Sequence, residues 1–205
     1  MKKSLLLSII ISQLIFFLSL PMIHHLFSYI HPLAFVVIWA VTTFCTAFII
    51  LAARDQTVIA PYPLFFSIMM VYTACLLVLL FIRPENQNYD NWNMTPFNTV
   101  RFFMSGRVPL LVEFYNLTAN VVLFIPYGFF LLELRKRLGI SIFSLIFYPL
   151  LCISMIEILQ HLTKRGSLDI DDVILNMSGV VIGYALYPLF HKVIRIKSKT
   201  TRPPE

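Results

Sequence analysis

Six long apolar runs, separated by shorter polar segments, dominate the pattern of this 205-residue chain. They occupy residues 4–22, 33–51, 63–82, 117–134, 140–161 and 173–190. An α-helix needs about 20 apolar residues to cross the hydrocarbon core of a bilayer, and each run comes close to that length. The runs do not alternate apolar and polar positions as the strands of a membrane barrel do. The pattern therefore predicts an all-α, polytopic bundle of about six transmembrane helices.

The composition agrees with this pattern, because 59% of the residues are hydrophobic and only 13% are charged. A soluble domain has about 25% charged residues. We therefore expect a multi-pass protein whose partners include membrane lipids. The three cysteines all lie inside apolar runs and show no CxxC spacing, so we expect no disulfide, no metal site and no cofactor.

Lys and Arg residues between the runs predict the orientation of the helices. With six spans, 11 of the 16 basic residues fall on one side: two before the first span, one after the second, three after the fourth and five after the sixth. Basic residues in short loops favour the cytoplasm, so both termini are predicted to be cytoplasmic. This asymmetry explains the net charge of +6, which is no argument for a nucleic-acid partner. The basic tail is expected to approach anionic lipid.

The chain divides into four predicted regions. Residues 1–82 form an N-terminal three-helix membrane region with almost no polar side chains, and residues 83–115 form an extracytoplasmic or interfacial segment. Residues 116–191 form a three-helix core, and residues 192–205 form a basic cytoplasmic tail. The aromatic residues of the second region suit headgroup depth, and a short interfacial helix is predicted after Pro96. A solvated loop is the alternative.

The last three spans carry polar side chains near the end that is predicted to face outward. Asn116 and Asn120 are four residues apart and share one helix face at the start of the fourth span. Pro126 cannot donate to the carbonyl of Val122, so a kink is predicted there. Helix capping explains Asn116 as well as a functional role does, but Asn120 lies deeper.

Glu157, Gln160 and His161 share one face in the last turns of the fifth span. A carboxylate so close to the hydrocarbon needs a partner or a raised pKa, which makes Glu157 a candidate catalytic acid or base. Glu157 and His161 alone do not make a metal site, because zinc sites use at least three protein ligands.

The sixth span begins near Asp172 and continues down one face with Asn176, Gly179 and Gly183. Asp172 is either a helix-capping residue or a second catalytic candidate. Asn176 lies too deep to cap the helix. The two glycines permit the close approach of a neighbouring helix.

Three aspartates, Asp169, Asp171 and Asp172, lie in the hairpin between the fifth and sixth spans. Such a cluster suits either Ca²⁺ or Mg²⁺ or pairing with arginine. We favour ion pairs with Arg165 and Arg101, because guanidinium matches a carboxylate with two parallel hydrogen bonds. The topology brings the polar ends of all three spans to a similar depth, which predicts one shared site.

Several of these residues lie in motifs that resemble the VanZ-like family. The motifs are NMTPF at residues 93–97, NVVLFIPYG at residues 120–128 with Asn116 before it, E-x-x-Q at residues 157–160, and DIDDV at residues 169–173 with Asn176, Gly179 and Gly183 after it. The resemblance begins near residue 93 and implies a bacterial cytoplasmic-membrane protein. The founding member of that family is associated with teicoplanin resistance. Asp171 stands where a neutral residue is usual, so the resemblance implies no special role for it.

The leading hypothesis is a contribution to lipoglycopeptide resistance through an outward-facing polar pocket that binds a lipid, a lipid-linked cell-wall precursor or the drug. The alternative is a membrane enzyme acting on a lipid-linked substrate at the outer leaflet, with Glu157 as general acid or base. A transporter is a weaker hypothesis, because the polar residues do not continue across the spans. The predicted ligand-binding residues are Asn93, Arg101, Asn116, Asn120, Glu157, Gln160, Arg165, Asp169, Asp172 and Asn176.

Overall fold

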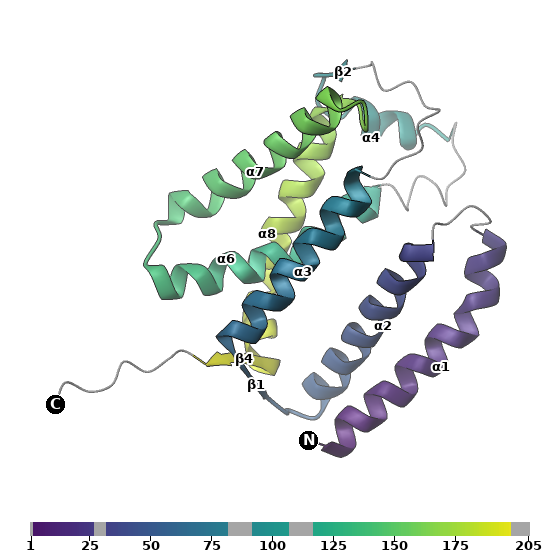
Figure 1. Cartoon of the computed structure of the whole chain (residues 1–205), viewed down its shortest axis with the longest axis vertical. Coiled ribbons are helices and arrows are strands. Elements are labelled where there is room, and N and C mark those ends of the chain that lie inside the picture. The colour runs from purple at the N-terminus through teal and green to yellow at the C-terminus, as the bar shows by residue number, and fades with distance from the viewer. Residues whose placement is uncertain (1, 27–31, 82–91, 107–116, 198–205) are drawn as a thin grey trace. The chain divides into compact units, whose positions relative to one another are not determined.

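The computed structural model describes residues 2–26, 32–81, 92–106 and 117–197 of the chain (Figure 1). The helices are α1 (Lys2–Leu26), α2 (Pro32–Ala53), α3 (Tyr62–Phe81), α4 (Asn98–Phe103), α6 (Ile125–Leu138), α7 (Ile142–Leu162) and α8 (Ile170–Val193). Four short strands, β1 (Val58–Pro61), β2 (Trp92–Asn93), β3 (Leu168–Asp169) and β4 (Ile194–Lys197), form two-stranded sheets, β1 with β4 and β2 with β3.

The helices confirm the predicted all-α membrane class. Within the described residues, five stretches are long and apolar enough to cross a membrane: Lys2–Pro21, Tyr62–Phe81, Leu117–Leu138, Ile142–Leu162 and Ile170–Val193. They coincide with five of the six predicted runs. The remaining run corresponds to α2, an apolar helix of 22 residues. The predicted region boundaries and the cytoplasmic termini stay predictions.

The contacts divide the chain into two units, one of residues Met1–Ile59 with His191–Arg195 and the other of residues Ala60–Phe190 with Ile196–Glu205. In the first unit, α1 and α2 form a hairpin. Ser4, Ser8 and Ser12 repeat at every fourth position of α1, and all three side chains are buried. Small residues at this spacing let membrane helices approach closely. Trp39 of α2 donates from Nε1 to Oε1 of Gln13 at 2.9 Å, which ties the two helices together.

In the second unit, an apolar core joins α3, α6, α7 and α8, with the buried side chains Leu76, Leu80, Phe124, Ile153 and Val180. Glycines bring α6 and α8 to backbone contact. A Cβ atom added at Gly128 of α6 would lie 2.6 Å from Cα of Gly183 in α8. A Cβ atom at Gly179 would lie 3.0 Å from Cβ of Phe124. The structure thus confirms the predicted close approach at these glycines.

The predicted kink at Pro126 is also confirmed. Residues 117–122 are helical, residues 123–124 form a turn, and α6 begins at Ile125 with the proline in its first turn. Proline lacks a backbone N–H group and cannot continue the hydrogen-bond ladder of the preceding turn. The carbonyl of Leu123 accepts a hydrogen bond from the hydroxyl of Tyr72 in α3 at 2.7 Å. The carbonyl group that the break leaves free is therefore hydrogen-bonded by a side chain from another helix.

Candidate functional site

A parallel strand pair joins the segment before α4 to the hairpin before α8. Trp92 pairs with Leu168, and Asn93 pairs with Asp169. The side chains repeat this connection, because Nδ2 of Asn93 donates to Oδ1 of Asp169 at 3.1 Å. The hydroxyl of Thr99 in α4 donates to the other carboxylate oxygen of Asp169. Asn93 and Asp169 are therefore in direct contact, and their part in ligand binding stays a prediction.

Asp171 anchors the start of α4. Its carboxylate accepts hydrogen bonds from the backbone N–H groups of Phe97, Thr99 at 2.7 Å and Val100 at 3.1 Å. The first N–H groups of any helix lack partners within the helix, and an acidic side chain satisfies both these groups and the positive end of the dipole. Phe97 adopts a left-handed conformation, with φ of 62°, immediately before the helix. The six-residue helix α4 confirms the predicted helix after Pro96.

These contacts correct two expectations. Asp171, for which no special role was expected, is fully buried and holds three backbone groups of a distant segment. The expected pairing with Arg101 or Arg165 is wrong for Asp169 and Asp171 within the described part of the chain. Both carboxylates accept from amide, hydroxyl and backbone N–H groups there. Those donors satisfy the carboxylates without a cation.

Asn120 and Asp172 form the second direct pair among the predicted residues. Nδ2 of Asn120 donates to Oδ1 of Asp172 at 2.6 Å, which joins the residue 117–122 helix to the first turn of α8. Asp172 and Glu157 both take part in further interactions. Glu157 is only 3% exposed, and Asn176 is equally buried, with its Oδ1 atom lacking a partner among the described residues. A buried acceptor without a donor is costly, so the neighbourhood of Asn176 is suited to an added donor.

The remaining predicted residues have more varied surroundings. Gln160 is buried and donates from Nε2 to the carbonyl of Leu80 at 2.9 Å, so its side chain fastens α7 to α3. The backbone N–H of Arg165 donates to the carbonyl of Gln160 and closes the end of α7. Arg101 is exposed on α4. Asn116 lies outside the described residues.

Exposed apolar side chains surround α4 and β2. Trp92, Met94, Phe97, Phe102 and Met104 are each at least half exposed, although they are large and apolar. Aromatic residues of this kind favour the boundary between hydrocarbon and water. They fit the predicted headgroup depth of this segment, which stays a prediction.

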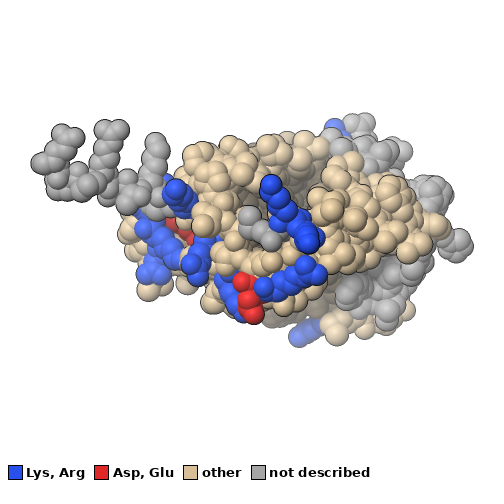
Figure 2. Space-filling view, turned by 90° about the horizontal axis from the view of Figure 1, so that it is seen from below, with Lys and Arg blue, Asp and Glu red and all other residues tan. Residues whose placement is uncertain are grey.

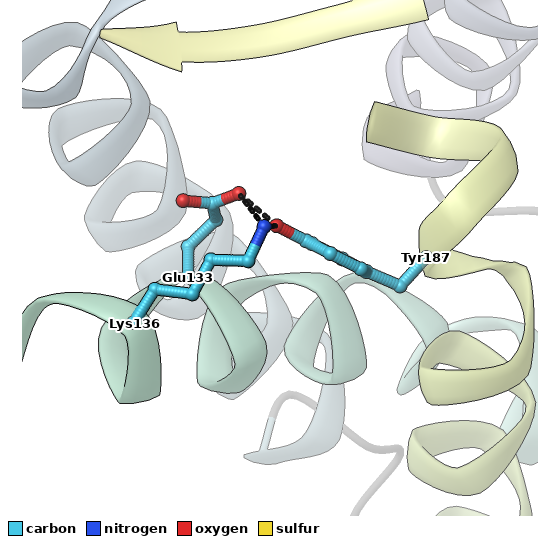
Figure 3. A network of polar contacts seen from close by, with 3 residues as sticks. All are labelled: Glu133, Lys136 and Tyr187. Carbon is cyan, nitrogen blue, oxygen red and sulfur yellow. Dashed lines mark hydrogen bonds and ion pairs between the residues drawn. The ribbon is translucent and has the colours of Figure 1, made fainter. Parts of the chain in front are cut away.

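The sequence analysis missed a second polar cluster, in which the buried Glu133 and Tyr187 meet the exposed Lys136 (Figure 3). Glu133 of α6 is only 5% exposed. The hydroxyl of Tyr187 in α8 donates to Oε1 of Glu133, and Nζ of Lys136 lies 2.6 Å from that hydroxyl and 4.0 Å from Oε1. The sequence did hold one indication of this cluster. Glu133 is a carboxylate inside an apolar run, and a carboxylate in such a place requires a polar partner.

The helices, the buried carboxylates and the polar end of α8 define a multi-helix membrane protein with a built polar site. The chain belongs to the VanZ/LLP1 family, whose sequence profile matches residues 66–191. It is 31% identical to Protein VanZ of Enterococcus faecium over 121 residues, which cover 58% of this chain and 70% of that protein. No solved structure matches the chain. The family resemblance read from the sequence is confirmed, and the match extends upstream of residue 93 into α3.

Proposed function

We propose that this VanZ/LLP1 family member lowers susceptibility to teicoplanin and related lipoglycopeptides by binding an amphiphilic ligand at the polar end of α8. The ligand is the drug, a membrane lipid or a lipid-linked cell-wall precursor. The site operates at the outer surface of a bacterial cytoplasmic membrane, in the orientation that the basic loops predict.

One observation supports this function best: an apolar groove runs along α8 and begins in the same turn of the helix that carries the polar cluster, on a different face. The groove has a volume of about 550 Å³ and is lined by Leu150 of α7 and by α8 residues from Ile170 to Ile182. Its lining begins beside Asp171 and Asp172, which hold the polar contacts of α4 and Asn120. Twelve residues of α-helix span ~18 Å, so the groove is long enough for an acyl chain of ordinary length.

The chemistry of the polar end suits a headgroup rather than a metal ion. Asn120 and Asp172 offer an amide and a carboxylate, and Asn176 offers a buried oxygen that meets no donor within the described ranges of the chain. Such groups recognise hydroxyls, amides and ammonium groups through directed hydrogen bonds. Ligand sites commonly combine an apolar wall with a few placed polar groups, and this end of α8 has both features.

The test is drug susceptibility of a teicoplanin-sensitive bacterium that expresses the chain. Asp172→Asn and Glu157→Gln keep side-chain size and remove charge, so we expect loss of protection against teicoplanin with nearly normal protein abundance in the membrane. Loss of a buried hydrogen-bond partner costs about 1–3 kcal/mol, so abundance is measured by immunoblot of the same membranes. Lys197→Gln, in β4 beyond the other end of α8, is the control and should leave protection unchanged.

The outcomes separate the alternatives. Normal abundance with full protection in both variants would dismiss the polar site. Equal protection against glycopeptides that carry no acyl chain would favour the enzyme alternative, in which Glu157 acts as general acid or base on a lipid-linked substrate.

The orientation has its own test. In a variant without native cysteines, Gly166→Cys should react with an impermeant thiol reagent added to intact cells, and Arg135→Cys should react only after the membrane is opened. Labelling of Arg135→Cys in intact cells would reverse the side of the site.

A further inference from the structure

A second pocket, independent of the proposed function, lies where the end of α2 meets the end of α8. It has a volume of about 230 Å³ and is lined by residues of two short stretches, 51–57 and 192–195. Leu51 and Val193 form an apolar floor and are almost fully buried. The walls are polar, with Asp55, Gln56 and Thr57 on one side and Lys192 and Arg195 on the other.

Specific bonds between the two stretches hold this pocket in shape. The hydroxyl of Thr57 donates to the backbone carbonyl of Lys192 at 2.9 Å. Nζ of Lys192 lies 2.6 Å from Oδ1 of Asp55. The backbone N–H of Gln56 donates to the carbonyl of Leu51 at 2.9 Å, so the chain turns back over the end of α2. These bonds fix the shape of the pocket between the turn after α2 and the end of α8.

The polar lining favours an anion that also carries a hydroxyl group. Lys192 and Arg195 supply two positive charges, and Asp55 supplies one negative charge, so the lining has an excess of one positive charge. Gln56 presents a buried Oε1 atom that has no hydrogen-bond partner among the described residues. A buried acceptor of this kind needs a donor, and a hydroxyl group supplies one.

The location favours a ligand at the membrane surface. Leu51 and Ala52 in the last turn of α2 and Val193 at the end of α8 line this pocket, and both helices are largely apolar. The ends of apolar helices lie where hydrocarbon gives way to lipid headgroups. Figure 2, which views the molecule from below, shows more Lys and Arg than acidic side chains on the surface in view. Basic pockets near helix ends bind the phosphates of anionic lipids.

We propose that this pocket binds a phosphate group with a hydroxylated substituent, as in the headgroup of an anionic glycerophospholipid. The phosphate oxygens accept hydrogen bonds from Lys192 and Arg195, because both cations form strong charge-assisted bonds with phosphate. A hydroxyl of the substituent donates to Oε1 of Gln56. Free glycerol phosphate has the same chemistry, so the experiment distinguishes the lipid from the soluble ester.

The test uses the full-length chain in detergent, with lipid binding counted by native mass spectrometry. The probes are phosphatidylglycerol, phosphatidic acid, phosphatidylcholine and glycerol phosphate. We expect phosphatidylglycerol to bind in preference to phosphatidylcholine. Arg195→Gln should weaken that binding roughly 10-fold, as expected for loss of one hydrogen bond to a charged group. Arg195 is exposed, so its replacement leaves the packing intact, and the elution profile of the variant checks this.

Two further variants sharpen the result. Arg135→Gln makes the same charge change outside the pocket and should bind phosphatidylglycerol like the unchanged chain. Gln56→Leu should weaken binding of phosphatidylglycerol but not of phosphatidic acid, whose headgroup lacks the hydroxylated substituent. Binding of glycerol phosphate that Arg195→Gln abolishes would support the same site with a soluble ligand. Equal losses in Arg195→Gln and Arg135→Gln, or no preference for any of the anionic probes over zwitterionic phosphatidylcholine, would overturn the proposal.

Discussion

The crossing of α6 and α8 gives the sharpest prediction about stability, through the substitution Gly128→Ala. The added Cβ atom would lie 2.6 Å from Cα and 2.7 Å from the carbonyl carbon of Gly183, with the carbonyl oxygen of Val180 closer still. All three atoms belong to the backbone of α8, so no side-chain rotation relieves the overlap. Carbon atoms rest at about 3.5–4.0 Å from one another, so the two helices must separate by roughly 1 Å.

The magnitude follows from two opposing effects. Overpacking of a well-packed contact costs about 1–3 kcal/mol, and this contact belongs at the upper end because only backbone can move. Alanine has a higher helix propensity than glycine, and this difference offsets about 1 kcal/mol of the overpacking cost. We therefore expect a net loss of about 1–2 kcal/mol, which changes the ratio of folded to unfolded protein about 5–30-fold.

The assay is reversible unfolding of the detergent-solubilised chain, followed by the loss of helical signal. Ala185→Leu is the matched control, because Ala185 lies on α8 two residues from Gly183 and is exposed. It should leave the midpoint nearly unchanged although it adds more atoms. A Gly128→Ala variant as stable as the unchanged chain would refute the reasoning, since it would mean that α6 and α8 are not in backbone contact.

Three further substitutions test other parts of the structure. Asp171→Ala leaves the first N–H groups of α4 without their acceptor, so we expect a loss of about 1–3 kcal/mol and faster hydrogen exchange at Thr99; unchanged exchange would contradict the anchoring role. Tyr187→Phe removes the hydroxyl that donates to Glu133 and should destabilise the chain by about 1–3 kcal/mol, but much less in a Glu133→Leu background, which offers no acceptor, as a double-mutant cycle would measure. The hydrogen bond and positive charge of Lys192 lower the pKa of Asp55, so this pair stabilises the fold above the usual pKa of the carboxyl and ceases to do so as the pH falls through the lowered value. Asp55→Asn should remove this part of the pH dependence of the unfolding free energy. If the variant keeps the same loss of stability at low pH, other carboxylates cause it.

Features with a local cause could be predicted from the sequence. The spans follow from run length, the break at Pro126 from a missing N–H group, and the contact at Gly179 and Gly183 from spacing on one helix face. Asn120 and Asp172 were placed in one site because both lie near the same ends of their spans, and the structure joins them directly.

Features that depend on distant partners could not be predicted. Asp171 caps a helix about 70 residues before it in the chain, and no local pattern indicates which N–H groups a carboxylate will meet. The same holds for Glu133 and Tyr187, whose contact depends on how α6 leaves the turn before Pro126 and crosses α8. Arginine was the expected partner for the aspartates because charge is visible in a sequence, whereas free backbone N–H groups are not.

The bond between Tyr72 and Leu123 has a consequence for how the protein is made. A backbone carbonyl exposed by a helix break is costly inside a bilayer, because no water is present to bind it. Tyr72 precedes Leu123 by 51 residues, so the ribosome synthesises the donor before the acceptor. The broken span can therefore find its missing hydrogen bond as soon as it leaves the insertion machinery, provided that α3 is still alongside. The order of synthesis thus favours pairing of the broken span with α3 during insertion rather than after it.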